Sequence, residues 1–313
     1  MDWRPGAEMP TLRARAALLA TVREFFAART VLEVETPLLC CDTVTEPAVA
    51  SYAITGEPRR FLQTSPEYAM KRLLAAGSGP IFQISRAFRA GEAGPRHNPE
   101  FSLLEWYRPE FDHNQLMSEV AELVTACLGR PSYSKISYRE LFREVLNIDP
   151  FTADVSQLRS VAGNSLDVSF DSADRDLWLD LLLSHLIEPA LVERGVCFVY
   201  DYPPSQAALA RLGYSDGVEV GHRFELYVDG MELANGYFEL TDARQQRLRF
   251  SEDNKRRLQA GLPILPLDER LLSALQSGLP ECSGVALGLD RLLMCQLGKA
   301  DIREVLAFDW TRC

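Results

Sequence analysis

A stretch near the C-terminus carries the residues best suited to bind a nucleotide. It reads Ser283-Gly284-Val285-Ala286-Leu287-Gly288-Leu289-Asp290-Arg291-Leu292, a glycine-bearing strand followed by a helix that opens with Asp-Arg. Small residues let a strand backbone approach a flat ligand, and an arginine at a helix start can stack on adenine or grip triphosphate oxygens. The stretch therefore indicates ATP binding without a Walker loop, although a strand and a helix ending at Gly298 can also be ordinary packing.

Two hairpins are expected to position further polar residues. The strand-like runs Ile81 to Arg89 and Pro99 to Arg108 are joined by the polar loop Ala90 to Asn98, and Arg89 ends the first run. A second hairpin is predicted over Arg223 to Leu240, because Asp229-Gly230 favours a turn of the primed type between alternating strands. A helix should follow over Thr241 to Gly261.

The N-terminal part predicts a helix, a strand and a second helix. Apolar residues recur at helical spacing from Thr11 to Arg29, with Thr11 as the expected N-cap, and Val31 to Thr36 alternates as a strand before Pro37. The second helix is expected to start at Ser65-Pro66-Glu67, with Ser65 as N-cap and Pro66 at the first helical position. Gly77 should lie just past its end.

Two regions predict structure but no readable chemistry. The segment from about residue 128 to 196 includes an apolar helix over Asp174 to Val192, on which His185 is interpreted as a core residue. A basic stretch in the predicted 241–261 helix is interpreted as a solvated helix face, because acids interrupt it. Its cations are Arg244, Arg247, Arg249, Lys255, Arg256 and Arg257.

Bulk properties narrow the class of protein. The 313 residues have a formal net charge of −11 at pH 7, which disfavours binding to polyanionic RNA. The seven cysteines and four histidines (His97, His113, His185, His222) form no ligand-spacing motif, so neither disulfides nor a zinc site is expected. The absence of a signal peptide or an apolar span predicts a cytoplasmic protein.

Four blocks in order resemble the catalytic domain of a lysyl-tRNA synthetase, a class II aminoacyl-tRNA synthetase. They are Phe88-Arg89 with Arg96-His97-Asn98-Pro99-Glu100-Phe101, then Glu105-Trp106-Tyr107, then Glu232-Leu233-Ala234-Asn235-Gly236 with Glu239-Leu240, and the Ser283–Leu292 stretch. The resemblance runs from about Thr11 to Gly298 and implies an α+β fold, an antiparallel β-sheet flanked by helices. We expect one catalytic domain over residues 1–313, with a variable insertion at about 128–196.

The resemblance also implies which residues hold ATP. Arg89 would pair with the α-phosphate and offset its growing charge, and Arg291 and Phe101 would sandwich the adenine. The remaining ATP contacts would come from the turn and strand residues Ala90, Gly91, Glu92, Asn98, Glu232, Leu233 and Gly288. Glu232 and Glu239 match the carboxylates that face Mg²⁺ in the family.

The implied amino-acid site is anionic. Glu67, Glu105, Tyr107 and Glu239 would surround a substrate with two ammonium groups, because buried carboxylates without cations are costly. Ser65, Pro66 and Ala286 complete the implied substrate contacts.

One block departs from the family pattern, Phe-Arg-x-Glu. Here Phe88-Arg89-Ala90-Gly91-Glu92 brings the acid one residue late. Either the loop shifts and Glu92 takes the role, or the backbone at Gly91 makes the contact.

The expected function follows from a feature that the family has and this sequence lacks. Only about ten residues precede the first expected helix, which leaves no room for an anticodon-binding barrel. The chain therefore resembles the ligases that activate (R)-β-lysine with ATP and transfer it to a lysine side chain of elongation factor P. Ala286, where lysyl synthetases commonly have glycine, agrees with a β-amino substrate, although alanine could simply pack better there.

Three other functions remain open at this point. A non-catalytic paralogue would have lost Arg89, Arg291 or the acids, and a truncated synthetase that charges tRNA would need a basic face. An asparagine synthetase of the same fold would need a basic substrate pocket. The helix and strand over Thr11 to Pro37 resemble the dimer-forming element of class II enzymes, so we expect a homodimer.

Overall fold

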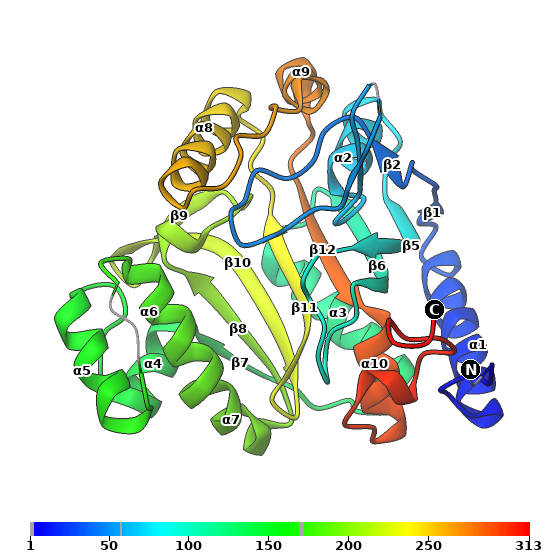
Figure 1. The fold of residues 1–313 in the computed structure, drawn as a ribbon, viewed down its shortest axis with the longest axis horizontal. Coiled ribbons are helices and arrows are strands. Elements are labelled where there is room, and N and C mark those ends of the chain that lie inside the picture. The colour runs from blue at the N-terminus through cyan, green and yellow to red at the C-terminus, as the bar shows by residue number, and fades with distance from the viewer. Residues whose placement is uncertain (1–2, 57, 169–171) are drawn as a thin grey trace.

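A mostly antiparallel sheet forms the centre of the molecule (Figure 1). The computed structural model describes residues 3–56, 58–168 and 172–313. In these residues nine strands form one sheet in the order β1-β5-β6-β12-β11-β10-β8-β7, with β9 paired to β10. The strands are β1 (Leu32–Glu33), β5 (Ile81–Phe88), β6 (Glu100–Pro109), β7 (Ser134–Ser137), β8 (Val196–Tyr202), β9 (Leu212–Ser215), β10 (Val218–Val228), β11 (Met231–Phe238) and β12 (Cys282–Gly288). Only the outermost pairs, β1–β5 and β7–β8, are parallel.

A second, smaller sheet lies beside the first part of the chain. Its strands are β2 (Leu39–Cys40), β3 (Ala53–Ile54) and β4 (Arg60–Leu62), in the order β2-β4-β3. In Figure 1 the blue segment between β2 and β3 crosses in front of the main sheet. Several contacts hold this segment; for example, the Thr45 hydroxyl donates to Asp253 at 2.7 Å, and the Ala90 N–H donates to the Ala50 carbonyl at 2.8 Å.

Helices surround the main sheet, which confirms the α+β prediction. They are α1 (Met9–Ala27), α2 (Glu67–Ala75), α3 (His113–Leu128), α4 (Tyr138–Leu146), α5 (Val155–Ser165), α6 (Arg175–Leu182), α7 (Glu188–Ala190), α8 (Ala243–Gln259), α9 (Glu269–Gly278) and α10 (Leu289–Leu297). A π-helical turn at Leu183–Ile187 continues α6. Short 3₁₀ turns lie at Leu191–Arg194, Pro204–Gln206 and Ile302–Glu304. Within the described ranges, every helix is too short or too polar to cross a bilayer.

Three apolar clusters hold these layers together. The largest joins α1, α3 and α10 to the sheet through side chains such as Phe26, Trp106 and Leu292, all fully buried. The second packs the helices of the 134–191 region on β7 and β8 around Trp178. The third packs α2 and α9 together around Leu74. The sheet is therefore covered by separate sets of helices that fix its strands in place.

One buried carboxylate ties together three segments that are distant in sequence. Asp290, at the start of α10, is only 2% exposed; it forms an ion pair with Arg15 of α1 and accepts the Ser102 N–H of β6 at 2.7 Å.

The two ends of the chain meet near α1 in Figure 1, where the N–H groups of Gly6 and Ala7 donate to the carbonyls of Ala307 and Leu306.

The predicted hairpins are confirmed, and several boundary predictions are wrong. Asp229 and Gly230 have φ values of 50° and 72°, as a turn of the primed type requires. The first helix starts at Met9 after Glu8, so Thr11 is not its N-cap; Pro10 is tolerated in the first turn, where its missing N–H costs nothing. The strand expected over Val31 to Thr36 shortens to Leu32–Glu33.

Two predicted side-chain environments also change. The second helix starts at Glu67 with Pro66 at the N-cap position, although the Ser65 hydroxyl still accepts the Glu67 N–H at 3.4 Å. His185 is exposed rather than in the core, because it lies on the outer side of the π-helical turn, where its Nδ1 approaches the hydroxyl of Ser184.

Candidate active site

Two cavities of opposite character lie side by side on the sheet and share Arg89, Asn235 and Ala286 as lining residues. The acidic cavity, of about 280 Å³, contains Glu46, Glu67, Glu105, Glu239, Glu252 and Asp253 in its lining. The basic cavity, of about 270 Å³, contains Arg89, Arg96, His97 and Arg291 together with Phe101, Glu92 and Glu232. The β-sheet places them next to each other because Ala286 of β12 pairs with Asn235 of β11 and with Glu105 of β6.

A buried lysine joins two carboxylates of the acidic cavity. Lys71 lies one turn after Glu67 on α2, and its Nζ is 2.6 Å from both the Glu67 and the Glu239 carboxylate. Lys71 and Glu239 are 2% and 1% exposed. Burial alone would lower the pKa of Lys71, but Glu239 and Glu67 raise it above its usual range, so the ammonium stays charged. Burial raises the pKa of Glu239 to about 7 in spite of Lys71.

Glu105 forms the floor of the same cavity with Tyr107. The Tyr107 hydroxyl donates to one Glu105 oxygen at 2.7 Å, while the other oxygen is buried without a hydrogen bond among the described residues. Burial, reinforced by Glu67, raises the pKa of Glu105 well above its usual range. Gly284 makes room for this arrangement, since a Cβ there would lie 2.3 Å from the Tyr107 ring and 2.5 Å from Glu239. The acidic cavity thus contains a carboxylate oxygen that accepts no hydrogen bond from the described residues.

Arg291 is oriented across the basic cavity by two backbone carbonyls and His97, with the Glu232 carboxylate farther away at 3.4 Å. Its guanidinium donates to the carbonyls of Arg96 at 3.1 Å and Glu232 at 2.8 Å. It also lies 2.6 Å from His97 Nε2. Desolvation and then Arg291 lower the pKa of His97 to about 4, so the imidazole is neutral at pH 7 and accepts this hydrogen bond. The face of Arg291 is therefore held in place while most of its charge remains available.

Arg89 lies where the two cavities meet. Its guanidinium carbon is 5.2 Å from the centre of the Phe101 ring, and its Nε is buried without a hydrogen bond in the described part of the chain. Glu92 approaches Arg89 at 3.9 Å and lines the basic cavity, whereas Ala90 donates its N–H to Ala50 instead. Gly91 has a φ of 82° and turns the loop. Of the two arrangements expected for this loop, the geometry favours Glu92 at the cavity.

The other residues expected at the site divide between cavity walls and supports. Leu233, Gly288 and Ala286 line the basic cavity, and Ser65 lines the acidic one. Pro66 lines a neighbouring cavity instead. Asn98 also reaches the basic cavity, but its amide donates to the Glu100 carbonyl at 2.6 Å and its oxygen accepts the Trp310 N–H at 2.9 Å.

The two carboxylates expected at Mg²⁺ lie in different cavities. Glu232 lines the basic cavity, 3.4 Å from Arg291, while Glu239 lines the acidic cavity against Lys71. Glu232 and Glu92 supply the hard oxygen donors that Mg²⁺ prefers on the nucleotide side. The carboxylate of Glu232 therefore fits Mg²⁺, whereas Glu239 lies beside Lys71 in the acidic cavity.

The sequence prediction missed residues that shape the acidic cavity. Lys71 is the most important, and its spacing of four residues from Glu67 on a helix was an available signal. The interpretation of the basic stretch as a solvated helix face is wrong for two of its residues. Arg257 is 7% exposed and donates to the Pro263 carbonyl, and Arg249 donates to the carbonyls of Ala208 and Ala210.

Comparisons with known proteins agree with this geometry. The family model of class II tRNA synthetases (D, K and N) matches residues 1–312. The chain is also similar to the elongation factor P–(R)-β-lysine ligase of Pseudoalteromonas translucida (strain TAC 125). The two are 48% identical over 319 residues, which cover 99% of this chain and 98% of the relative.

Proposed function

Since this chain belongs to the family of class II tRNA synthetases (D, K and N), we propose that it is an ATP-dependent ligase that activates (R)-β-lysine and transfers it to elongation factor P. The acceptor is a lysine side chain of that factor. The similarity to a ligase of this name along nearly the whole length of both chains supports the substrate and the acceptor. The chemistry of the two cavities supports the reaction.

The observation that carries the proposal is the unbalanced charge of the acidic cavity. Glu67, Glu105 and Glu239 converge there with a single internal ammonium, that of Lys71. A lysine isomer brings two ammonium groups, which would balance the two remaining carboxylates. Burial raises the pKa values of both Glu105 and Glu239 above their usual ranges, so ammonium groups beside them would favour their ionised forms.

The reaction follows from the way the cavities meet. With its ammonium groups in the acidic cavity, the substrate points its carboxylate toward Arg89 and the basic cavity, which holds ATP against Arg291 and Phe101. A carboxylate oxygen attacks the α-phosphorus, and pyrophosphate leaves. Arg89 stabilises the charge that develops on the α-phosphate. The acceptor amine then attacks the acyl carbon and AMP leaves. Mg²⁺, held by Glu232, would neutralise phosphate charge when bound.

The remaining properties of the enzyme belong to the same proposal. It acts as a homodimer through α1 and the following strand, which light scattering at micromolar concentration tests; a monomer near 35 kDa would contradict it. It acts in the cytoplasm, and the seven unpaired cysteines agree with a reducing compartment. The net charge of −11 disfavours tRNA as an acceptor.

Mass spectrometry of elongation factor P tests the proposal. After incubation with enzyme, ATP and (R)-β-lysine, the factor should gain the mass of one lysyl group, and lysine tRNA should stay uncharged. Arg89→Ala enzyme is the matched control and should leave the factor unmodified. Robust charging of tRNA with no modified protein would instead identify a lysyl-tRNA synthetase paralogue that activates lysine for tRNA.

A further inference from the structure

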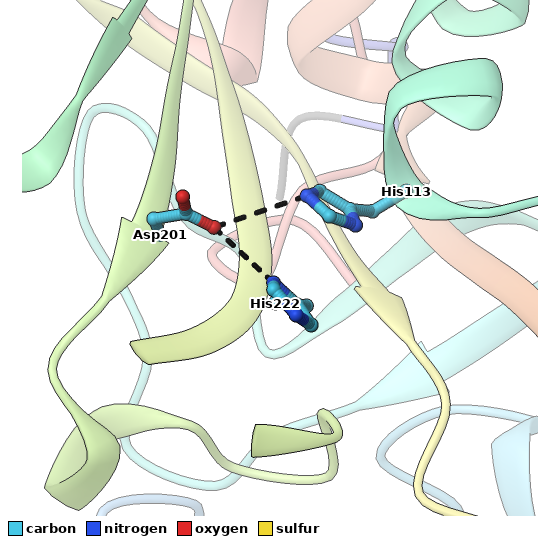
Figure 2. A group of neighbouring side chains, drawn as sticks. All are labelled: His113, Asp201 and His222. Carbon is cyan, nitrogen blue, oxygen red and sulfur yellow. Dashed lines mark hydrogen bonds and ion pairs between the residues drawn. The ribbon is translucent and has the colours of Figure 1, made fainter. Parts of the chain in front are cut away.

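Two histidines and an aspartate meet outside the cavities just described (Figure 2). His113 is the first residue of α3, Asp201 lies on β8 and His222 lies on β10. Both imidazoles lie near Phe238 of β11, at 6.5 and 6.4 Å between ring centres. Neighbouring strand residues point to opposite faces, so the cluster lies across the sheet from Tyr237 and Glu239 of the acidic cavity. It is therefore separate from the proposed catalytic site.

A β-bulge brings the ligand atoms together. Between the pairs Gly221–Tyr202 and Phe224–Tyr200 the register shifts, so that two residues of β10 oppose Asp201, whose φ is 58°. The nearest Asp201 oxygen is 3.4 Å from His222 Nδ1 and 3.8 Å from His113 Nε2. All three ligand atoms lie within 4.8 Å of one another. A tetrahedral ion with bonds of about 2.0–2.1 Å needs its ligands about 3.3–3.4 Å apart, so the ligand atoms must move closer together and one imidazole must turn out of the stack to bind it.

One nitrogen of each imidazole lies near the Asp201 carboxylate: His222 Nδ1 and His113 Nε2. A Cβ on Gly213 would lie 2.1 Å from His222 Nε2, so β9 covers that nitrogen and leaves Nδ1 toward Asp201. The nearest hydrogen-bond partner of His113 Nε2 is the Asn114 amide at 3.4 Å, which is long for a hydrogen bond. The two rings stack at 4.7 Å with an angle of 17° between them.

Asp201 and His113 are buried with few partners among the described residues. Asp201 is 6% exposed, and in the described ranges no lysine or arginine lies within ion-pair distance of it. His113 is 8% exposed, and its Nδ1 is buried with no hydrogen bond to any described residue. A buried carboxylate without a cationic partner is costly, so this position favours a bound cation.

We propose that His113, Asp201 and His222 bind one transition-metal ion, with Zn²⁺ as the best match to two imidazoles and a carboxylate. The ion fastens the start of α3 to β8 and β10 and keeps a fourth position for water. The histidine spacing did not predict such a site, because the fold brings together residues that the sequence separates.

Zinc binding to the metal-free enzyme tests the site. Equilibrium dialysis with ZnCl₂ and a competing chelator, without ATP or Mg²⁺, should give one tightly bound ion per chain. His222→Gln and Asp201→Asn should each weaken binding by more than the roughly 10–100-fold that loss of an outer hydrogen-bond partner costs. His185→Gln removes an exposed histidine and serves as the matched control, with unchanged binding.

The same measurements exclude other positions for the ion. Zinc K-edge absorption should show two imidazoles and no sulfur bound to the ion. The same result is expected in a Cys40→Ser/Cys41→Ser variant, which removes two thiols that are consecutive in the sequence. Circular dichroism of the metal-free variants shows whether each is folded. If the histidine variant is unfolded, Asp201→Asn provides the test. Absence of stoichiometric binding, sulfur ligation, or binding lost in Glu232→Gln but kept in Asp201→Asn would each overturn the proposal.

Discussion

The innermost charged groups of the acidic cavity are buried and paired with one another, whereas the arginines of the basic cavity are more exposed and lie farther from their nearest carboxylates, at 3.4 and 3.9 Å. The Lys71 and Glu239 side chains are 2% and 1% exposed, against 33% for Arg89 and 19% for Arg291. Buried carboxylates respond to missing cations by binding protons, as the raised pKa values of Glu105 and Glu239 show. Arginine keeps its charge at any accessible pH. One cavity therefore adjusts its charge to its contents, and the other holds a fixed charge.

Removing the internal cation should have the largest effect, and it tests whether the acidic cavity depends on pairing. Lys71→Met leaves two buried carboxylates without their partner and should lower the free energy of unfolding by about 3–5 kcal/mol. Urea unfolding measures this. Adding Glu239→Gln to Lys71→Met should restore part of the loss.

The matched control for Lys71 is an exposed ion pair. Lys255 is 2.9 Å from Glu252 but 69% exposed, so Lys255→Met should change stability by less than about 1 kcal/mol. Equal stability of the Lys71 and Lys255 variants would mean that the acidic cavity does not need its internal cation.

Loss of a fixed charge at the junction should affect catalysis rather than folding. Arg89→Ala should lower the rate of ATP–pyrophosphate exchange by about 10²–10³-fold, the usual effect of losing one donor at a developing charge. Arg291→Ala should act in the same direction. The melting temperature of Arg89→Ala should stay close to that of the parent enzyme.

Arg86→Ala is the control for a charge that lies outside both cavities, on β5 just before Arg89. Its side chain is 47% exposed and lies 3.6 Å from Glu100. It should exchange at the parent rate. Parent-like exchange in Arg89→Ala would remove this residue from the proposed site.

A smaller effect is expected where the two cavities touch. Ala286→Gly removes one methyl group at the junction and should move the preference from (R)-β-lysine toward α-lysine by about 10–200-fold in kcat/KM. Pyrophosphate exchange with each isomer gives this ratio. Ala87→Gly, at a buried position of β5 outside both cavities, should leave the ratio unchanged. An unaltered ratio in both variants would assign the isomer choice to other residues.

The adjustable charge of the acidic cavity predicts a modest pH dependence. Burial raises the pKa of Glu239 to about 7, so this carboxyl loses its proton as pH rises through 7 and then attracts an ammonium group. The KM for the lysine isomer should therefore fall between pH 6 and 8, by at most about tenfold per pH unit for a single ionisation. His97 stays neutral in this range, because its pKa is lowered to about 4.

Substituting the titrating group tests its assignment. Glu239→Gln should bind the substrate more weakly and show a flat profile between pH 6 and 8. A profile that keeps its slope in Glu239→Gln would identify a different group as the source of the pH dependence.

The sequence predicted the elements whose signals are local. The Asp229-Gly230 turn and the strands on either side of the 90–98 loop depend on neighbouring residues, and both were correct. The first helix began early because Pro10 is compatible with its first turn, a case in which two local signals compete. Lys71 was visible as a helical neighbour of Glu67, but its second partner, Glu239, comes from a distant strand. The cluster of His113, Asp201 and His222 depends on a bulge and on α3 meeting β10, which no local pattern predicts.

The bonds of Asp290 have a consequence for how the protein is made. This carboxylate joins partners that are 275 and 188 residues away in sequence, and β12 lies between β6 and β11 in the sheet. A nascent chain in which Cys282–Leu297 has not yet been synthesised therefore lacks β12, the central strand beneath both cavities. It also lacks Arg291 of the basic cavity. Contacts of such long range form late, because the loop must close before they stabilise anything. The nucleotide side of the proposed site is therefore incomplete until Cys282–Leu297 has left the ribosome.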